Sequence, residues 1–229
     1  MLKLMRLEMK KHKLGWYWRG AVISCLCVII LMGVLPMIDQ ELEDAFGSFE
    51  EVFTAMSIFV RVIFVIMASV LIGRLIISEY NNKTMTVMFT YPVPRKKIML
   101  AKILLIMSIT LFSLLISNVL VIGVFLVLNS MLHMLPGVPT KELLFHQGLD
   151  IFIQGLSAVG ISMVPLYFGM RKKSVSATIV SAVILISLLS SNNGGFSISS
   201  FIAVPITIGL IGLFIAYMSF RNVEHVDVV

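Results

Sequence analysis

The most informative deficit in this 229-residue sequence is its small number of charged residues. Asp, Glu, Lys and Arg make up 13% of the chain, whereas a soluble globular domain has about 25%. Hydrophobic residues reach 59%, and the mean hydropathy is +1.01. A soluble protein of this composition could not cover its own surface with polar groups, so the sequence predicts an integral membrane protein.

The sequence also has few residues suited to disulfide bonding, metal binding or catalysis. Its two cysteines, Cys25 and Cys27, stand two positions apart in an apolar run, and on a helix this spacing turns them to different sides. Its four histidines fall in or beside predicted loops, and no H-E-x-x-H pair occurs. No G-x-x-x-x-G-K-[ST] segment is present to bind the phosphates of ATP. We therefore expect no catalytic, metal-binding or cofactor-binding residues and no enzyme activity of the chain by itself.

Long apolar runs divide the chain into predicted membrane spans. A helix of about 20 apolar residues crosses the hydrocarbon core of a bilayer. Six runs meet this requirement: 20–38, 55–77, 100–128, 149–170, 174–191 and 201–220. They lack the alternation of barrel strands, and only helices or closed barrels satisfy the backbone within a bilayer. The predicted fold is an all-α membrane protein, in which residues 1–229 form a single transmembrane domain.

Positive charge alternates between the two sides of these predicted spans. Lys and Arg cluster before the first span and in the loops after the second and fourth spans. By contrast, 39–51 is acidic, 136–148 has Lys141 as its only Lys or Arg, and 192–200 is uncharged. Because basic loops face the cytoplasm, the pattern predicts a multi-pass protein of a bacterial-type plasma membrane with both termini cytoplasmic. The same topology accounts for the net charge of +6, so that charge does not indicate nucleic acid binding.

Residues 1–19 have the pattern of an amphipathic helix that lies in the membrane interface. Cations recur there at helical spacing, and aromatic side chains follow at the predicted headgroup level. The residues expected to contact lipid are Lys3, Arg6, Lys10, Lys13, Trp16 and Trp18. The cations would face anionic headgroups. The alternative is a basic leader that only sets the topology.

The cytoplasmic loop 78–97, between the second and third spans, predicts a further short helix. Its first part, 78–89, can be helical, and Glu79 with Lys83 forms a favourable pair four residues apart. Pro92 ends the predicted helix, because proline has no backbone donor and restricts the residue before it. A short helix parallel to the membrane provides a docking surface for a partner protein.

Three short patterns follow one another in and after this loop. They are Glu79-x-x-x-Lys83-Thr84, Tyr91-Pro-Val-Pro-Arg95 and Ala101-Lys102. Together with the interfacial helix, the six spans and the short C-terminal tail, these patterns resemble the permease subunits of ABC-2 type transporters. The narrower similarity is to small permeases for bacitracin resistance, lantibiotic immunity and export of amphipathic peptide toxins such as phenol-soluble modulins.

The resemblance implies the transmembrane subunit of an ATP-driven exporter for an amphipathic, antimicrobial or toxin peptide. A separate ATPase subunit dimer would bind ATP and Mg²⁺, and a second permease copy or a related permease would complete the membrane part. The ATPase would contact Glu79, Tyr80, Lys83, Thr84, Val87, Tyr91 and Arg95. The alternative is a non-pumping immunity or scaffold protein that binds a peptide or partner. An ion-coupled carrier is disfavoured, because the spans hold almost no acidic residue apart from Asp150.

Arg61 lies inside the second predicted span, a little below its outer end. A charge at this depth is costly, which makes Arg61 a candidate functional residue within the membrane. The sequence favours a second interpretation, in which the side chain extends outward to meet Glu50 or Glu51.

Small and hydroxyl-bearing residues inside the spans predict contacts between helices. They lie on the third, fourth and fifth spans: Thr110, Ser113 and Ser117, then Ala158 and Ser162, then Ala177 and Ser181.

Overall fold

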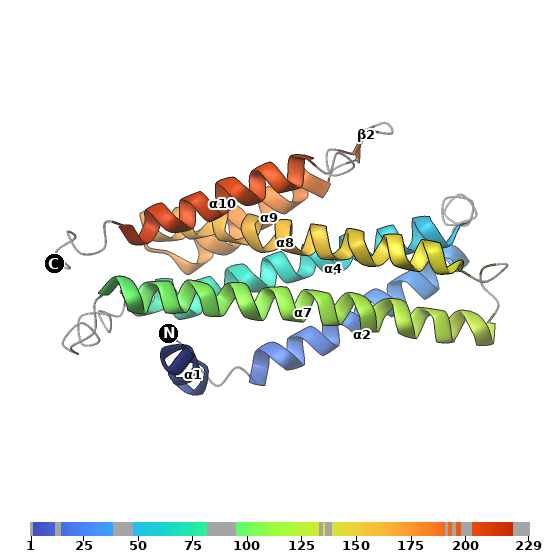
Figure 1. Ribbon diagram of the computed structural model, residues 1–229, viewed down its shortest axis with the longest axis horizontal. Helices are drawn as coiled ribbons and strands as arrows, with labels where there is room; N and C mark the ends of the chain where they lie inside the picture. The colour runs from blue at the N-terminus through green and yellow to red at the C-terminus, as the bar shows by residue number, and fades with distance from the viewer. Residues whose placement is uncertain are drawn as a thin grey trace.

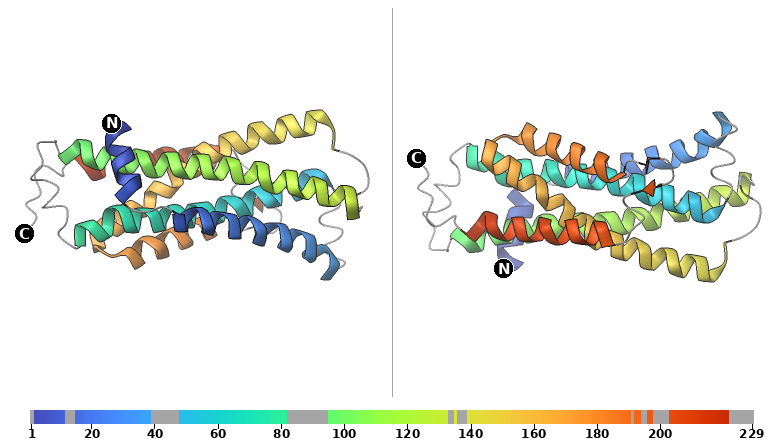
Figure 2. Two further views of the ribbon diagram at one scale, coloured as in Figure 1. Left: turned by 90° about the horizontal axis from the view of Figure 1, so that it is seen from below. Right: turned by 90° about the horizontal axis from the view of Figure 1, so that it is seen from above.

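The computed structural model describes residues 2–11, 15–38, 48–81, 95–132, 135, 139–190, 192–193, 196–197 and 203–221. Long helices run side by side along the long axis of the molecule, and one short helix, α1, lies across them near one end (Figures 1 and 2). The helical elements are α1 (Leu2–Lys11), α2 (Gly15–Ile38), α4 (Phe49–Ile72), η1 (Gly73–Ile77), α5 (Ser78–Asn81), α7 (Arg95–Leu132), α8 (Lys141–Lys172), α9 (Val175–Ser190) and α10 (Ala203–Arg221).

The predicted all-helical membrane architecture is confirmed. Among the described residues, four helical stretches are long and apolar enough to cross a membrane: Gly15–Gly33, Phe49–Tyr80, Lys97–Met131 and Lys141–Lys172. The last two apolar helices, in α9 and α10, are shorter. Each of the six predicted spans therefore falls on an apolar helix. That all six cross the bilayer stays a prediction.

A minimal antiparallel β pair lies between α9 and α10, where the sequence predicted an uncharged loop. Strand β1 (Asn192–Asn193) pairs with β2 (Phe196–Ser197), and Asn193 stands opposite Phe196. The pair lies at the ends of α9 and α10 that point away from α1, and α7 and α8 extend beyond it (Figures 1 and 2).

The second apolar helix continues further than predicted. α4 begins with a capping box, in which the Ser48 hydroxyl accepts from the Glu51 backbone and Glu51 reaches back to the Ser48 backbone. The helix then passes through the π-helical turn η1 directly into α5, with right-handed helical backbone at Gly73 and Ser78. The sequence predicted a separate helix starting at Ser78. Instead, residues 78–81 extend the second membrane helix.

α4 lies at the centre of the bundle and contacts α2, α7, α8 and α9. Its buried side chains include Phe53, Phe64, Val65 and Leu71, each at most 1% exposed. These large apolar residues recur at helical spacing and fill the interior. Apolar side chains elsewhere remain exposed along the outer faces of α2, α7 and α10, as expected of surfaces that meet lipid.

α8 and α10 make the closest helix contact in the bundle. A Cβ atom at Gly212 would overlap the carbonyl oxygen of Gly160, and a Cβ at Gly160 would stand 2.6 Å from the Cα of Gly209. Three glycines therefore allow the two backbones to touch, as small residues do in membrane helix pairs. This seam attaches the C-terminal helix firmly to the bundle.

Candidate functional site

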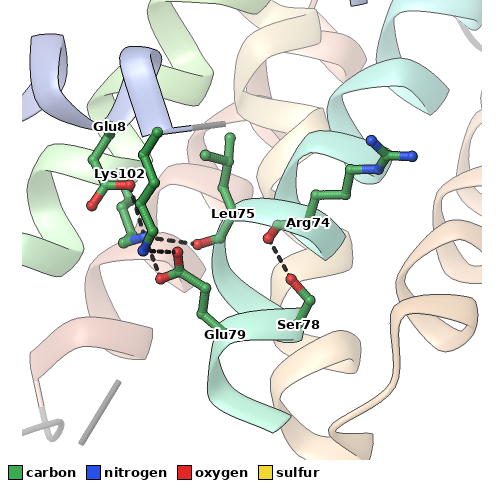
Figure 3. Close-up of polar contacts among 7 residues, drawn as sticks. Glu8, Arg74, Leu75, Ser78, Glu79 and Lys102 are labelled. Atoms are coloured by element: carbon green, nitrogen blue, oxygen red, sulfur yellow. Dashed lines mark hydrogen bonds and ion pairs between the residues drawn. The ribbon is translucent and has the colours of Figure 1, made fainter. Parts of the chain in front are cut away.

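Charged side chains from α1, α5 and α7 meet at the end of the bundle where α1 lies (Figure 3). Lys102 is at the centre. Its Nζ donates to Glu79 Oε2 at 2.6 Å, to Glu8 Oε2 at 3.1 Å and to the backbone oxygen of Leu75 at 3.0 Å. The other carboxylate oxygen of Glu79 accepts from Lys11 Nζ at 2.7 Å. We call Glu8, Lys11, Glu79 and Lys102 the charge cluster.

Most of the charge cluster is removed from solvent. Lys102 is 0% exposed, Glu79 5% and Glu8 8%. A lysine ammonium group has three donors, and the three acceptors around Lys102 satisfy all of them. The formal charges of the four residues also cancel. Burial of these ions is therefore tolerated only while the set stays complete, because an unpaired buried charge is strongly destabilising.

Local structure places each member of the charge cluster. Glu8 and Lys11 are three residues apart on α1 and so share one face of that helix. Glu79 lies in the first turn of α5, directly after the π-helical turn that supplies the Leu75 oxygen. Lys102 lies about two turns into α7. The cluster thus ties the interfacial helix to the two helices that flank the predicted docking loop.

The structure corrects the predicted exposure of Glu79. The sequence analysis placed this carboxylate on an exposed docking surface, but the side chain is buried against Lys102 and Lys11. The predicted pair with Lys83 involves a residue outside the described ranges. Tyr80 is partly buried, and Lys173 Nζ lies 5.4 Å from the centre of its ring. The remaining predicted contacts lie outside the described residues or, for Arg95, at a described helix start whose side chain is not described: Lys83, Thr84, Val87, Tyr91 and Arg95.

α1, the predicted interfacial helix, is held by protein contacts that the sequence analysis did not foresee. Arg6 is exposed, as a lipid-facing cation requires, but Glu8 turns toward the bundle and binds Lys102. The signal was available, because Glu8 is the only acidic residue among the first 38. The side chains of Lys3, Lys10 and Lys13 lie outside the described residues.

The two tryptophans at the predicted headgroup level differ in their surroundings. The Arg74 guanidinium carbon lies 4.1 Å from the centre of the Trp16 ring, so Trp16 is engaged by a cation from η1. Trp18 is 49% exposed and free to meet lipid. Lipid contact by these two residues stays a prediction.

Arg61 forms part of a second polar region, deeper in the bundle. Its side chain is 4% exposed, and Nη1 donates to Gln154 Oε1 at 3.1 Å. The interpretation that Arg61 extends outward to Glu50 or Glu51 is therefore wrong. Glu51 instead closes the capping box at the start of α4. Arg61 stays inside because α8 supplies an uncharged amide acceptor beside it.

Comparison with known proteins identifies the class to which this molecule belongs. Residues 4–190 match the family model described as ABC-2 family transporter protein. The chain therefore belongs to this family and is a multi-pass membrane component of an ABC-2 type transporter. Permeases of this family lack the ATPase domain, so the chain is not an enzyme by itself, and membership implies a partner ABC ATPase.

A full-length relative supports this assignment. The chain is 42% identical over 230 residues to a Bacillus subtilis (strain 168) protein named "Uncharacterized protein YcbO", and the match covers 99% of this chain and 100% of that protein. No solved structure matches. The predicted family is thus confirmed, while the narrower similarity to peptide-export and resistance permeases stays a prediction.

Proposed function

We propose that this chain is the permease subunit of an ATP-driven exporter, and that its ATPase docks on the segment between α5 and α7. The observation that carries the proposal is the charge cluster. The docking segment, residues 82–94, joins two helices that are fixed to each other by the 2.6 Å ion pair between Glu79 and Lys102. A partner that moves this segment therefore acts on both helices together.

The charge cluster is suited to transmit such a movement. Buried ion pairs resist separation, since removing one partner costs about 3–5 kcal/mol. Glu79 and Lys102 should accordingly move as a unit, and Glu8 and Lys11 extend that unit to α1. For ATP to bias the permease between states, the two states must differ in their contacts with the ATPase, and a rigid connection is needed to carry that difference into the membrane.

The arrangement of the helix ends supports the proposed orientation. α1, the end of α5, the start of α7 and the end of α10 all lie at one end of the bundle (Figures 1 and 2). This end would be cytoplasmic, because the basic segments of the sequence border it. The ATPase dimer would bind ATP and Mg²⁺ there, and a second permease copy or a related permease would complete the membrane part.

The proposed substrate is an amphipathic or antimicrobial peptide. Two features of the sequence support it: the resemblance to small peptide-export permeases, and the acidic segment 39–51, which would attract cationic peptides on the outer side. An exporter couples peptide movement to ATP turnover, whereas a non-pumping immunity protein would bind peptide without stimulating the ATPase. An ATPase gene beside this one would also favour the exporter.

Two kinds of variant, assayed in proteoliposomes with the ATPase partner, test the proposal. Lys83→Glu with Tyr91→Ala changes the docking segment and should release the ATPase during co-purification. Glu79→Gln alters the charge cluster and should retain the ATPase while reducing peptide export per ATP hydrolysed. Glu142→Gln, an exposed carboxylate at the opposite end of the bundle, serves as the control. Full ATPase retention and full export by both variants would show that the segment is only a connector.

A further inference from the structure

A small polar cavity lies inside the helix bundle around Arg61. It has a volume of about 10 Å³ and is lined by residues of α4, α7 and α8. Four of its lining residues are polar: Ser57, Arg61, Asn118 and Gln154. Each helix contributes one face, since Ser57 and Arg61 are four residues apart on α4 and Ile151 and Gln154 are three apart on α8.

Two buried polar atoms beside this cavity have no hydrogen-bond partner in the described structure. One is a donor, the Nε of Arg61, and the other is an acceptor, the Oδ1 of Asn118. Other atoms of these two side chains do have partners. Arg61 Nη1 donates to Gln154 Oε1, and Asn118 Nδ2 donates to the backbone oxygen of Leu114. Arg61 is 4% exposed and Asn118 2%, so bulk solvent does not reach them.

Buried donors and acceptors are rarely left unpaired, because desolvation without a replacement bond costs free energy. The penalty is larger for the guanidinium group, since within the described ranges no carboxylate forms an ion pair with it. A water molecule needs a cavity of about 10–15 Å³ and two to four polar partners. The cavity beside Arg61 and Asn118 meets both requirements.

We infer that this cavity is a binding site for one internal water molecule, which accepts a hydrogen bond from Arg61 Nε and donates one to Asn118 Oδ1. The water oxygen has a second lone pair and the molecule a second hydrogen, which Ser57 and Gln154 on the cavity wall can engage. The site thus hydrates a single arginine that is otherwise enclosed by helices.

The site joins three helices through polar contacts. Gln147 on α8 donates to Ser57 on α4 at 3.2 Å, one turn along α4 from the contact of Arg61 with Gln154. The water adds α7 to this set through Asn118. The three helices are therefore linked by a short chain of hydrogen bonds inside the bundle, and the water connects them.

A high-resolution structure of the full-length protein in a lipid nanodisc tests the inference, together with brief hydroxyl-radical labelling in water. Wild type should show one density peak between Arg61 and Asn118, and the buried Leu114 on the cavity wall should be labelled. Ile106, which is 0% exposed on the same helix and lines none of the described cavities, is the internal control for labelling.

Asn118→Leu removes the acceptor and should eliminate both the density peak and the labelling of Leu114. Asn129→Leu is the matched variant, because Asn129 lies on the same helix and its amide is already paired with Leu135. It should leave the peak and the labelling as in wild type. A dry cavity in wild type, at a resolution that shows other buried waters, would overturn the inference, as would unchanged labelling of Leu114 in Asn118→Leu. If Asn118→Leu fails to fold, the wild-type density and labelling alone decide the question.

Discussion

At the residue scale, the charge cluster shows how a membrane protein keeps ions away from solvent near the end of its helices. Lys102 is completely buried, yet each of its three donors has an acceptor, and two of the acceptors carry the opposite charge. Glu79 is bound from both sides, by Lys102 and by Lys11. The members of the cluster depend on one another, so a substitution of the central Lys102 should destabilise the protein more than a substitution at the edge of the cluster.

We expect Lys102→Met to destabilise the protein by about 3–5 kcal/mol, because it leaves buried carboxylates without their central partner. Glu79 would keep Lys11, but Glu8 would lose its bond to Lys102. Thermal unfolding in detergent measures the effect as a lowered midpoint. Glu142→Gln, which neutralises an exposed carboxylate, should leave the midpoint unchanged. Equal midpoints for the two variants would show that the buried ion pairs contribute nothing to stability.

At the element scale, α1 has two attachments of different kinds. Its cationic face is predicted to meet anionic headgroups, whereas its Glu8 and Lys11 bind the protein. An amphipathic interfacial helix held by lipid alone would move with the lipid. The contacts made by Glu8 and Lys11 instead fix α1 across α7 and tie it to α5 (Figure 2).

Glu8→Gln should therefore loosen α1 while leaving the transmembrane bundle intact. A spin label attached at the exposed position Arg6 would report this as increased mobility in electron paramagnetic resonance spectra. The matched variant is Glu50→Gln, which neutralises an exposed carboxylate at the start of α4, far from the charge cluster, and should not change the spectrum. Equal mobility in all three proteins would mean that lipid, and not Glu8, holds the helix.

The contact between α8 and α10 predicts a sharp difference between two glycines. Gly212→Ala places a methyl group against the Gly160 carbonyl and should cost about 1–3 kcal/mol, as overpacking does. Gly123→Ala, on α7, meets nothing within 4 Å and should be neutral or slightly stabilising. Thermal unfolding of the two variants makes the comparison. A stable Gly212→Ala protein would contradict the close approach of these helices.

At the scale of the whole molecule, the bundle has a basic end and a less basic end. The turn between α8 and α9, at Lys173, lies at the same end as α1, and the start of α8, at Thr140, lies at the opposite end (Figure 1). Among the described residues, Lys173 is the one non-glycine residue with a positive φ. It ends α8 in the left-handed conformation that allows the chain to reverse. Topology can thus be tested with two exposed, structurally defined positions.

In a variant whose Cys25 and Cys27 are replaced by serine, we expect Thr140→Cys to react with an impermeant maleimide added to intact cells. Lys173→Cys should react only after the cells are permeabilised, because the basic end faces the cytoplasm. Labelling of both cysteines after permeabilisation confirms that the two are accessible. The reverse pattern in intact cells would place both termini outside and would exclude ATPase docking at residues 82–94.

The sequence by itself determined the membrane character, the six apolar helices and the family of this protein. These properties depend on hydropathy, on charge distribution and on the short patterns around Glu79 and Lys102, all of which are local. The sequence analysis ended the second helix too early, because it relied on the same local hydropathy. Hydropathy falls after Ile77, but no helix breaker follows until beyond residue 81, so the polar residues continue the same helix.

Only the tertiary structure decided which residues meet. Glu8 and Lys102 are 94 positions apart, and Arg61 and Gln154 are 93 apart, so no periodicity within one helix reveals either pair. Glu79 was predicted at an exposed surface because a carboxylate in a polar segment is normally solvated. It is buried because α1 and α7 bring two lysines to it, and the attraction between these opposite charges compensates for the desolvation of Glu79 and Lys102.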